Sequence, residues 1–278
     1  MKIKIVKHSG DIVDFDSKKL KKSLVKSGAS ETVVEDILNI IGKEIFEGIS
    51  TKQIYKRAFS LLKKAANSHA ARYNLREGLR LLGPAGFFFE KYIARLFSSE
   101  NYQTKTNLIL QGKCISHEID VLVKKDGVIG MIECKFHSRR EATSDVKVPL
   151  YVLSRFNDLK ERDYAIFDRR EAISKCWIST NNRFTSDAID FAKCTGLNLL
   201  SWDYPKNNSL KTKNDIDCLY PVTCLTTLSI AEKDKLLILD ILLVKELANN
   251  SDKLKKIGLS SNRVTNVLKE ARELSKCV

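Results

Sequence analysis

Two short segments near the middle of the chain alternate apolar and polar residues, with a Lys-Asp-Gly triplet at 125–127 between them. The alternation predicts two β-strands, and the triplet predicts the turn that joins them as a hairpin. Side chains two residues apart on a strand share a face. We therefore expect Glu118 and Asp120 to point together from the first strand, and Glu133 and Lys135 to point together from the second. The hairpin brings carboxylates and an ammonium group to one end.

This set of side chains suits the cleavage of phosphodiester bonds. Carboxylates hold divalent metal ions, and a metal with a neighbouring cation favours attack by water on a phosphate. Asp120 followed by Glu133-x-Lys135 is the shortest sequence pattern of such a site. The alternative is an ordinary polar strand edge, because so short a pattern also occurs by chance. Its place on a hairpin in a basic chain favours the site.

The charge of the chain points to a polyanionic partner. It has 48 Lys and Arg against 34 Asp and Glu, a net charge of +14 over 278 residues. Basic surfaces dominate binding to nucleic acid, so nucleic acid is the first expectation. The alternative is a basic protein whose charge serves only solubility.

Length and composition limit the number of domains and the cellular compartment that we expect. A chain of 278 residues suggests about two domains with room for a small third. The apolar runs are too short to span a bilayer, and no signal-peptide core opens the sequence. Seven cysteines without a C-x-x-C pair indicate reduced thiols, so we expect a cytoplasmic protein without a membrane partner.

The first 83 residues form a pattern of their own. A hairpin with its turn at Ser9-Gly10 is followed by four expected helices, at about 17–28, 30–47, 50–66 and 68–82. The third helix begins with a capping box, Ser50-x-x-Gln53. Gly83-Pro84 marks the end of this region.

This pattern resembles the ATP-cone, the nucleotide-binding module of ribonucleotide reductase large subunits and of the repressor of their genes. The resemblance rests on Val6-Lys7-His8-x-Gly10, Phe15-Asp16-x-x-Lys19-Leu20, Gly48-Ile49-x-Thr51-x-x-Ile54 and Ala71-Arg72-Tyr73. It implies that ATP or dATP binds in the first 80 residues. There is no G-x-x-x-x-G-K-[ST] motif, so binding without hydrolysis is expected.

The resemblance also assigns roles to five residues. Lys7 and Lys19 correspond to lysines that hold nucleotide phosphates, and Asp16 and Thr51 to polar contacts with the nucleotide. His8 stands where the family usually has arginine, and a neutral imidazole is a weaker phosphate partner than a guanidinium group. From the residues alone, Lys19 is part of a solvated lysine-rich helix face and Thr51 is part of a helix cap.

Residues 84–206 predict an α/β sandwich with a mixed sheet. Their pattern gives the order helix, three strands, helix, strand, helix, strand, at about 84–97, 102–110, the two strands of the hairpin, 146–159, 175–180, 185–196 and 197–202. Pro149 is compatible with the second helix because it lies in or near the first turn.

This order, together with the Asp…Glu-x-Lys pattern, resembles the restriction-endonuclease-like superfamily, over about residues 86–205. Mrr-like type IV restriction enzymes and archaeal Holliday-junction resolvases are the nearest groups. The resemblance implies that Asp120, Glu133 and the backbone carbonyl of Cys134 hold Mg²⁺ or Mn²⁺. Lys135 would orient the attacking water and stabilise charge on the phosphate.

Two further residues match positions of that superfamily. Glu90, on the first helix, corresponds to an additional acidic residue, and Lys147 corresponds to a polar active-site residue on the following helix. His117 falls on the opposite strand face from Asp120, so we interpret it as structural. The Cys134 thiol is expected to act as a small buried hydrophobe rather than a nucleophile.

After the second domain, the polar run at 206–215 predicts a linker. Helices are expected beyond it at about 231–248, 251–257 and 261–276. The last two helices, punctuated by Gly258, faintly resemble a helix-hairpin-helix that offers backbone N–H groups to DNA phosphate. A small packing subdomain is the equal alternative.

The sequence therefore predicts an α/β multidomain protein with boundaries at 1–83, 84–206 and 207–278. The expected function is a Mrr-like, Mg²⁺-dependent DNA endonuclease in which ATP or dATP gates activity or only stabilises the fold. A homo-oligomer, a dimer or larger, is expected because one site cuts one strand. The rival is a nucleotide-responsive DNA-binding regulator with an inactive nuclease fold, and RNA is a third possible substrate.

Overall fold

The structure, a computed structural model, describes residues 3–7, 9–83 and 86–276. The chain forms two compact units, one of Met1–Gly78 with Tyr220–Val278 and the other of Leu79–Leu219. The domain boundaries expected from the sequence stay predictions, and Pro84 of the expected first boundary lies outside the described residues.

The first unit begins with a hairpin and a set of short helices, as expected. Strands β1 (Lys4–Val6) and β2 (Ile12–Asp14) pair antiparallel, and helices α1 (Ser17–Val25), α2 (Glu31–Glu44), α3 (Thr51–Ala65), α4 (Asn67–Tyr73) and α5 (Leu75–Arg80) follow. The single helix expected at 68–82 is instead broken between α4 and α5 at Asn74. Its amide oxygen accepts a hydrogen bond from the Tyr55 hydroxyl at 2.7 Å.

Strand β1 also lies against the segment that precedes α3. Val6 forms a parallel bridge with Ser50, and its N–H donates to the Ile49 carbonyl at 3.0 Å. Ser50 caps α3 through the expected capping box with Gln53. The end of β1 and the start of α3 are therefore neighbours, although they are more than 40 residues apart in the sequence.

The C-terminal part of this unit consists of η1 (Val222–Cys224), α10 (Ile230–Ile238), η2 (Val244–Asn249), α11 (Ser251–Lys256) and α12 (Ser261–Leu274). The helix expected at 231–248 is wrong in length. It ends at Ile238 because Asp240 adopts a positive φ of 60°, and the Glu246 carboxylate then accepts the Leu242 and Leu243 N–H groups at 2.8 and 3.0 Å.

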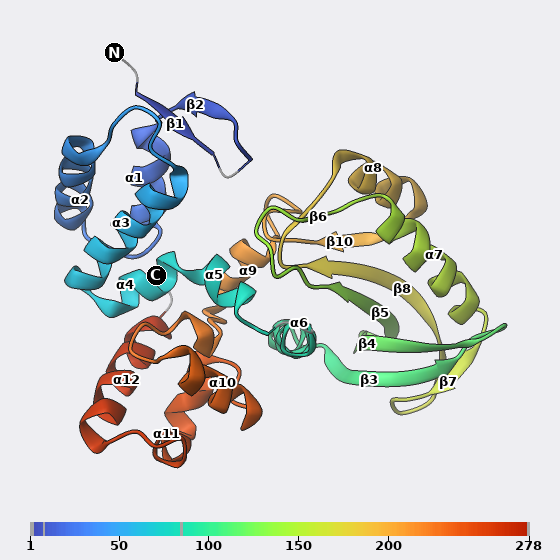
Figure 1. The fold of residues 1–278 in the computed structure, drawn as a ribbon. Coiled ribbons are helices and arrows are strands. Elements are labelled where there is room, and N and C mark those ends of the chain that lie inside the picture. Colours follow the sequence, from blue (N-terminus) through green and yellow to red (C-terminus); the bar gives the residue numbers. More distant parts are fainter. Residues whose placement is uncertain (1–2, 8, 84–85, 277–278) are drawn as a thin grey trace. The chain divides into compact units, whose positions relative to one another are not determined.

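The second unit contains the mixed sheet predicted from the sequence. Its strand order is β10-β8-β5-β4-β3, and β7 pairs with β8 (Figure 1). The strands are β3 (Gln103–Gln111), β4 (Ser116–Lys125), β5 (Val128–Lys135), β7 (Asp163–Ala165), β8 (Arg170–Thr180) and β10 (Asn198–Leu200). Strands β5, β8 and β10 run parallel, and the β3, β4 and β5 pairs are antiparallel.

Helices cover both faces of this sheet (Figure 1). On one face, α7 (Lys147–Leu159) and α8 (Ser186–Thr195) supply Val152, Leu159, Ala188 and Ala192 to a core with Met131 and Ile178 of the strands. On the other, α6 (Phe87–Ser99) packs its Phe97 ring edge-on against Trp177, at 5.8 Å between centroids. Short strands β6 (Thr143–Ser144) and β9 (Arg183–Phe184) pair separately.

The expected linker at 206–215 is wrong, because helix α9 (Leu210–Asp217) occupies most of it. Ser209 caps this helix by accepting the Thr212 N–H at 3.2 Å, and Leu210 and Asn214 are buried. The polar composition of the segment concealed this buried face.

Two findings concern apolar helices and the cysteines. Within the described part of the chain, no helix has the length and apolar composition needed to span a lipid bilayer. Five cysteines are free, namely Cys114, Cys134, Cys176, Cys194 and Cys224. Cys218 departs from the expected reduced state because it is disulfide-bonded.

Candidate active site

The β4–β5 hairpin has the register that the site requires. Asp126 and Gly127 both have positive φ, 52° and 76°, which is the geometry of the tight turn expected there. The turn sets Val121 opposite Ile132. The next residues outward are Asp120 and Glu133, where the Asp120 carboxylate accepts the Cys134 N–H at 2.6 Å. Asp120 thus binds the neighbouring strand through its side chain at the open end of the hairpin.

Glu133 is almost completely buried, with 4% of its surface exposed. The Lys135 ammonium lies 2.7 Å from its Oε1, and the Arg155 guanidinium bonds its Oε2. The two basic groups approach the carboxylate from different elements, Lys135 from β5 and Arg155 from α7. A buried carboxylate is tolerated when it is paired in this way.

Arg155 is the site residue that the sequence reasoning missed. Its guanidinium also donates to the backbone carbonyl of Glu118, so it joins β4, β5 and α7. It lies over the Tyr151 ring, 5.5 Å from the centroid, and the Lys135 ammonium lies 6.0 Å from the same centroid. The signal was available: Tyr151 and Arg155 are four residues apart on a predicted helix and therefore share one face.

The carboxylates of the site repel one another. Burial, reinforced by the charges of Glu133 and Glu90, raises the pKa of Asp120 to about 7, although the Cys134 N–H and Lys135 oppose the shift. Burial and the charges of Glu118 and Glu133 likewise raise the pKa of Glu90. Strongly perturbed carboxylates in one place are typical of functional sites. The structure thus brings together Asp120, Glu133, Lys135 and Glu90.

The donor atoms suit a hard divalent cation. Among the described residues, no group of three or more His, Cys, Asp or Glu side chains is arranged to hold a metal. Mg²⁺ commonly uses only one or two carboxylates and keeps several water molecules. Asp120 and Glu133 meet that requirement, and the raised pKa of Asp120 reflects a site in which a nearby cation would be favourable. Both Glu133 oxygens already have basic partners, so a metal there would have to displace one of them.

The remaining expected residues lie as follows. Lys147 is exposed in the first turn of α7, and among the described contacts its ammonium makes none with Asp120 or Glu133, so its role stays a prediction. His117 is directed to the end of α7, where its Nε2 lies 2.8 Å from Asp158 and lowers the pKa of that carboxyl group. Burial raises the pKa of the Cys134 thiol, which keeps it neutral and unreactive.

Three of the expected nucleotide-binding residues, Asp16, Lys19 and Thr51, lie at helix N-termini in the other unit. Asp16 caps α1 by accepting the Lys19 N–H at 3.2 Å, and the Lys19 ammonium lies 3.7 Å from its carboxylate. Thr51 begins α3, beside the end of β1, and Lys7 directly follows that strand. Helix N-termini and lysines favour anions. His8 lies outside the described residues.

Two family models match this chain. One, described as a restriction endonuclease, matches residues 84–204, and the other, described as AF1548-like, C-terminal, matches residues 220–275. The first confirms the restriction-endonuclease-like domain expected from the sequence. Neither model reaches the first 83 residues, so the ATP-cone interpretation stays a prediction.

Individual proteins resemble larger parts of the chain. An uncharacterized protein of Archaeoglobus fulgidus is 32% identical over 183 residues, which are 66% of this chain and 99% of that protein. The crystal structure of AF1548, a protein of unknown function, is similar with a TM-score of 0.56 and 31% identity, covering 68% of this chain and 97% of that chain. This chain therefore belongs to the family of the Archaeoglobus fulgidus protein, and it combines a restriction-endonuclease-like domain with an AF1548-like C-terminal domain.

Proposed function

We propose that the restriction-endonuclease-like domain is a Mg²⁺- or Mn²⁺-dependent DNA endonuclease. The observation that carries the proposal is the meeting of Asp120, Glu133 and Lys135 at the open end of one hairpin. A bound metal would polarise the phosphate and lower the pKa of the attacking water. The net charge of +14 supports a nucleic-acid substrate, and RNA remains open as an alternative to DNA.

The protein's own groups would have distinct tasks in this reaction. Asp120 and Glu133 supply negative oxygens that position the metal, and Asp120 does so fully only above about pH 7, when it is ionised. Lys135 is flexible enough to move from Glu133 to the phosphate, where its charge stabilises the charge that develops there. Arg155 then neutralises Glu133 and holds it in place.

The test is cleavage of supercoiled plasmid with Mg²⁺ or Mn²⁺, by the wild-type protein, by Asp120→Asn and by Glu161→Gln. Glu161 is an exposed carboxylate whose ion-pair partner is Lys113 rather than any residue of the candidate site, so its variant is the matched control. We expect nicking by the wild type and by Glu161→Gln, with a loss of at least about 100-fold in Asp120→Asn. Metal-dependent nicking that survives in Asp120→Asn would contradict the assignment.

The second candidate is a DNA-binding regulator whose nuclease fold is inactive. The engagement of both Glu133 oxygens by Lys135 and Arg155 favours this candidate, because no metal can bind there unless one of them moves. It predicts firm, salt-sensitive binding to duplex DNA in gel shifts without any metal-dependent nicking.

We further propose that Lys7, Asp16, Lys19 and Thr51 bind ATP or dATP, which gates cleavage through the oligomeric state or only stabilises the fold. The test compares ATP binding by Lys19→Ala and Lys18→Ala, two exposed lysines on the same helix. We expect weaker binding only in Lys19→Ala. Gating additionally requires that the nucleotide bind two states with different affinities. It fails if neither ATP nor dATP alters the cleavage rate or the size measured by light scattering.

A further inference from the structure

A second site lies on the sheet face opposite Glu133. A cavity of about 250 Å³ is bounded by the C-terminal end of α6, strands β8 and β10, and the segment that leads into α9. Trp177 of β8 is in register with Ile132, whereas Glu133 is in register with Ile178. Because successive strand residues alternate between faces, the cavity and the Glu133 side chain lie on opposite faces of the sheet.

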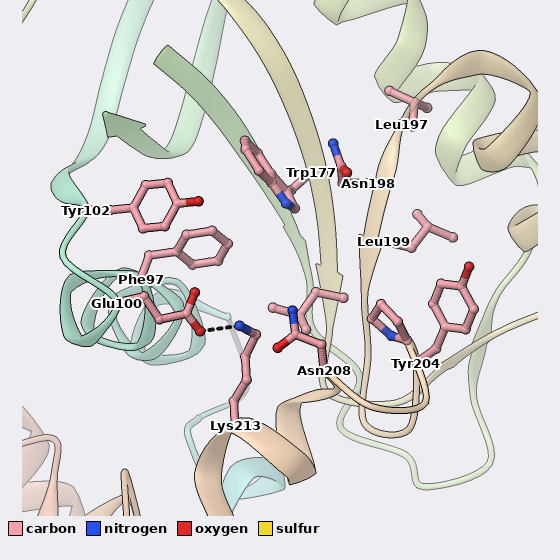
Figure 2. Close-up of a pocket in the computed structure, with 12 residues that line it drawn as sticks. Phe97, Glu100, Tyr102, Trp177, Leu197, Asn198, Leu199, Tyr204, Asn208 and Lys213 are labelled. Carbon is pink, nitrogen blue, oxygen red and sulfur yellow. Dashed lines mark hydrogen bonds and ion pairs between the residues drawn. The ribbon is translucent and has the colours of Figure 1, made fainter. Parts of the chain in front are cut away.

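Four aromatic side chains from separate segments line the cavity (Figure 2), namely Phe97, Tyr102, Trp177 and Tyr204. Phe97 contacts both Tyr102 and Trp177 edge-on, with centroids 5.2 and 5.8 Å apart. The six-membered ring of Trp177 lies over Gly130, where an added Cβ would come within 2.2 Å of it. Gly130 therefore lets the indole rest on strand β5 while another part of the ring borders the cavity.

The cavity is also lined by hydrogen-bond donors and hydrogen-bond acceptors. Glu100 and Lys213 face each other as an ion pair, with 28% and 9% of their side chains exposed. Asn198 is held by donation of its amide to the Cys176 carbonyl at 3.2 Å, and Asn208 lies on the exposed rim. Carboxylate, ammonium and carboxamide groups together offer donors and acceptors around aromatic walls (Figure 2).

We propose that this cavity binds one planar nitrogen heterocycle of the nucleobase type. Aromatic side chains bind bases by stacking, irrespective of sequence. The edge of a base carries donors and acceptors together, as the walls do. The volume lies just below the range of about 300–1,000 Å³ for drug-sized ligands, so it suits a single ring system. Lys213 is neutralised by Glu100, which makes the cavity unsuitable for a bare phosphate.

The same chemistry could come from two sources, a free nucleoside or nucleotide and an unstacked base of a nucleic-acid strand. The proposal goes beyond the proposed cleavage reaction and does not depend on it, because binding needs no metal. A protein without nuclease activity could still bind a base here, and an active nuclease could lack this binding.

The experiment uses the fluorescence of Trp177. The chain has two tryptophans, so Trp202→Phe leaves Trp177 as the only reporter. In that background, metal-free protein is titrated with adenosine, guanosine, cytidine and thymidine. It is also titrated with a single-stranded oligonucleotide and with its counterpart of abasic nucleotides. We expect saturable quenching with a Kd below about 1 mM for at least one probe that carries a base.

Asn208→Ala and Asn207→Ala form the matched pair, since both side chains are exposed neighbours and only Asn208 lines the cavity. We expect Asn208→Ala to weaken binding about fivefold, the effect of one hydrogen bond, and Asn207→Ala to leave it unchanged. Quenching by nucleosides would identify a free base as the source, and quenching only by the base-carrying oligonucleotide would identify a strand. The proposal is overturned if no probe quenches, if the abasic oligonucleotide quenches equally, or if both variants bind alike.

Discussion

The buried carboxylate of Glu270 and the half-buried carboxylate of Asp120 have opposite surroundings. Glu270 of α12 is 2% exposed, and its oxygens accept four hydrogen bonds. The donors are the N–H and hydroxyl groups of Thr226 and Thr227, at 2.6 to 3.0 Å. Asp120 accepts one backbone hydrogen bond and faces the charges of Glu133 and Glu90.

The difference separates a carboxylate that hydrogen bonds stabilise from one whose neighbours disfavour its charge. Burying a charge is unfavourable unless hydrogen bonds replace the lost water. Glu270 has those bonds, so it fastens α12 to the loop before α10. Among the described contacts Asp120 accepts one such bond, so its charged form is disfavoured below about pH 7, and a bound cation would stabilise it. A carboxylate therefore stabilises the fold at Glu270. At Asp120 it destabilises the metal-free fold, and a bound cation would relieve that destabilisation.

The largest expected effect is on the structural side of this comparison. Replacement of Glu270 by Gln turns its amide donor toward the N–H and hydroxyl donors of the threonines. Because buried donors then lose their acceptor, we expect the free energy of unfolding to fall by about 2–4 kcal/mol. Urea unfolding followed by circular dichroism measures it. If Glu270→Gln lowered the free energy of unfolding no more than a surface substitution does, the contrast between Glu270 and Asp120 would fail.

Asp120→Asn should raise the free energy of unfolding, whereas Glu270→Gln should lower it. The pKa of Asp120 is about 7 in the folded protein against an ordinary value of 3.8, so the folded state binds the proton more tightly than the unfolded chain. The ionised carboxyl group therefore destabilises the fold progressively from about pH 4 to 7, and fully above pH 7. We expect Asp120→Asn to raise the free energy of unfolding by about 1–3 kcal/mol at pH 8.

The pH series supplies the control for that variant. At about pH 3 the Asp120 carboxyl group is protonated in the folded state and mostly protonated in the unfolded chain, whose ordinary pKa is 3.8, so the difference between Asp120→Asn and the wild type should nearly vanish there. Metal-free protein must be used, because a bound cation would reverse the sign. Equal stabilisation at both pH values would mean that the side chain's shape, rather than its charge, is responsible.

Metal binding should show the same titration. Because a ligand carboxylate must lose its proton, the affinity for Mn²⁺ is expected to fall about tenfold per pH unit below pH 7. Calorimetric titration from about pH 5.5 to 8 measures this slope. Glu90→Gln should move the onset to lower pH, since the charge of Glu90 contributes to raising the pKa of Asp120. An identical slope in Asp120→Asn would assign the proton to another group.

The sequence predicted the geometry of the β4–β5 hairpin better than that of the parts that surround it. Alternating residues and a tight turn fix register locally, and so Asp120 and Glu133 could be paired without knowledge of the fold. Arg155 could be placed on a helix face, but its contact with Glu133 depends on how α7 packs on the sheet. Tertiary packing also set the pKa of Asp120, which no local pattern contains.

The errors share a physical cause. Helix α9 was taken for a linker because its polar residues hid a buried Leu210 and a capping Ser209. The helix expected at 231–248 was too long, because the sequence around Asp240 does not predict its positive φ. Helix propensity is a property of the local sequence. Where a helix begins and ends also depends on burial and on capping by groups that are distant in the sequence.

The smallest expected effect concerns a third carboxylate, Glu44, which is exposed. It makes a bidentate ion pair with Arg57, one bond of which is 2.6 Å long, and both side chains are at least 40% exposed. Exposed pairs contribute little because water solvates the separated charges almost as well. We expect Glu44→Gln to change the free energy of unfolding by less than about 1 kcal/mol, with the effect shrinking in 0.5 M salt. A loss as large as that of Glu270→Gln would mean that pairing, rather than burial, governs how much a carboxylate matters in this protein.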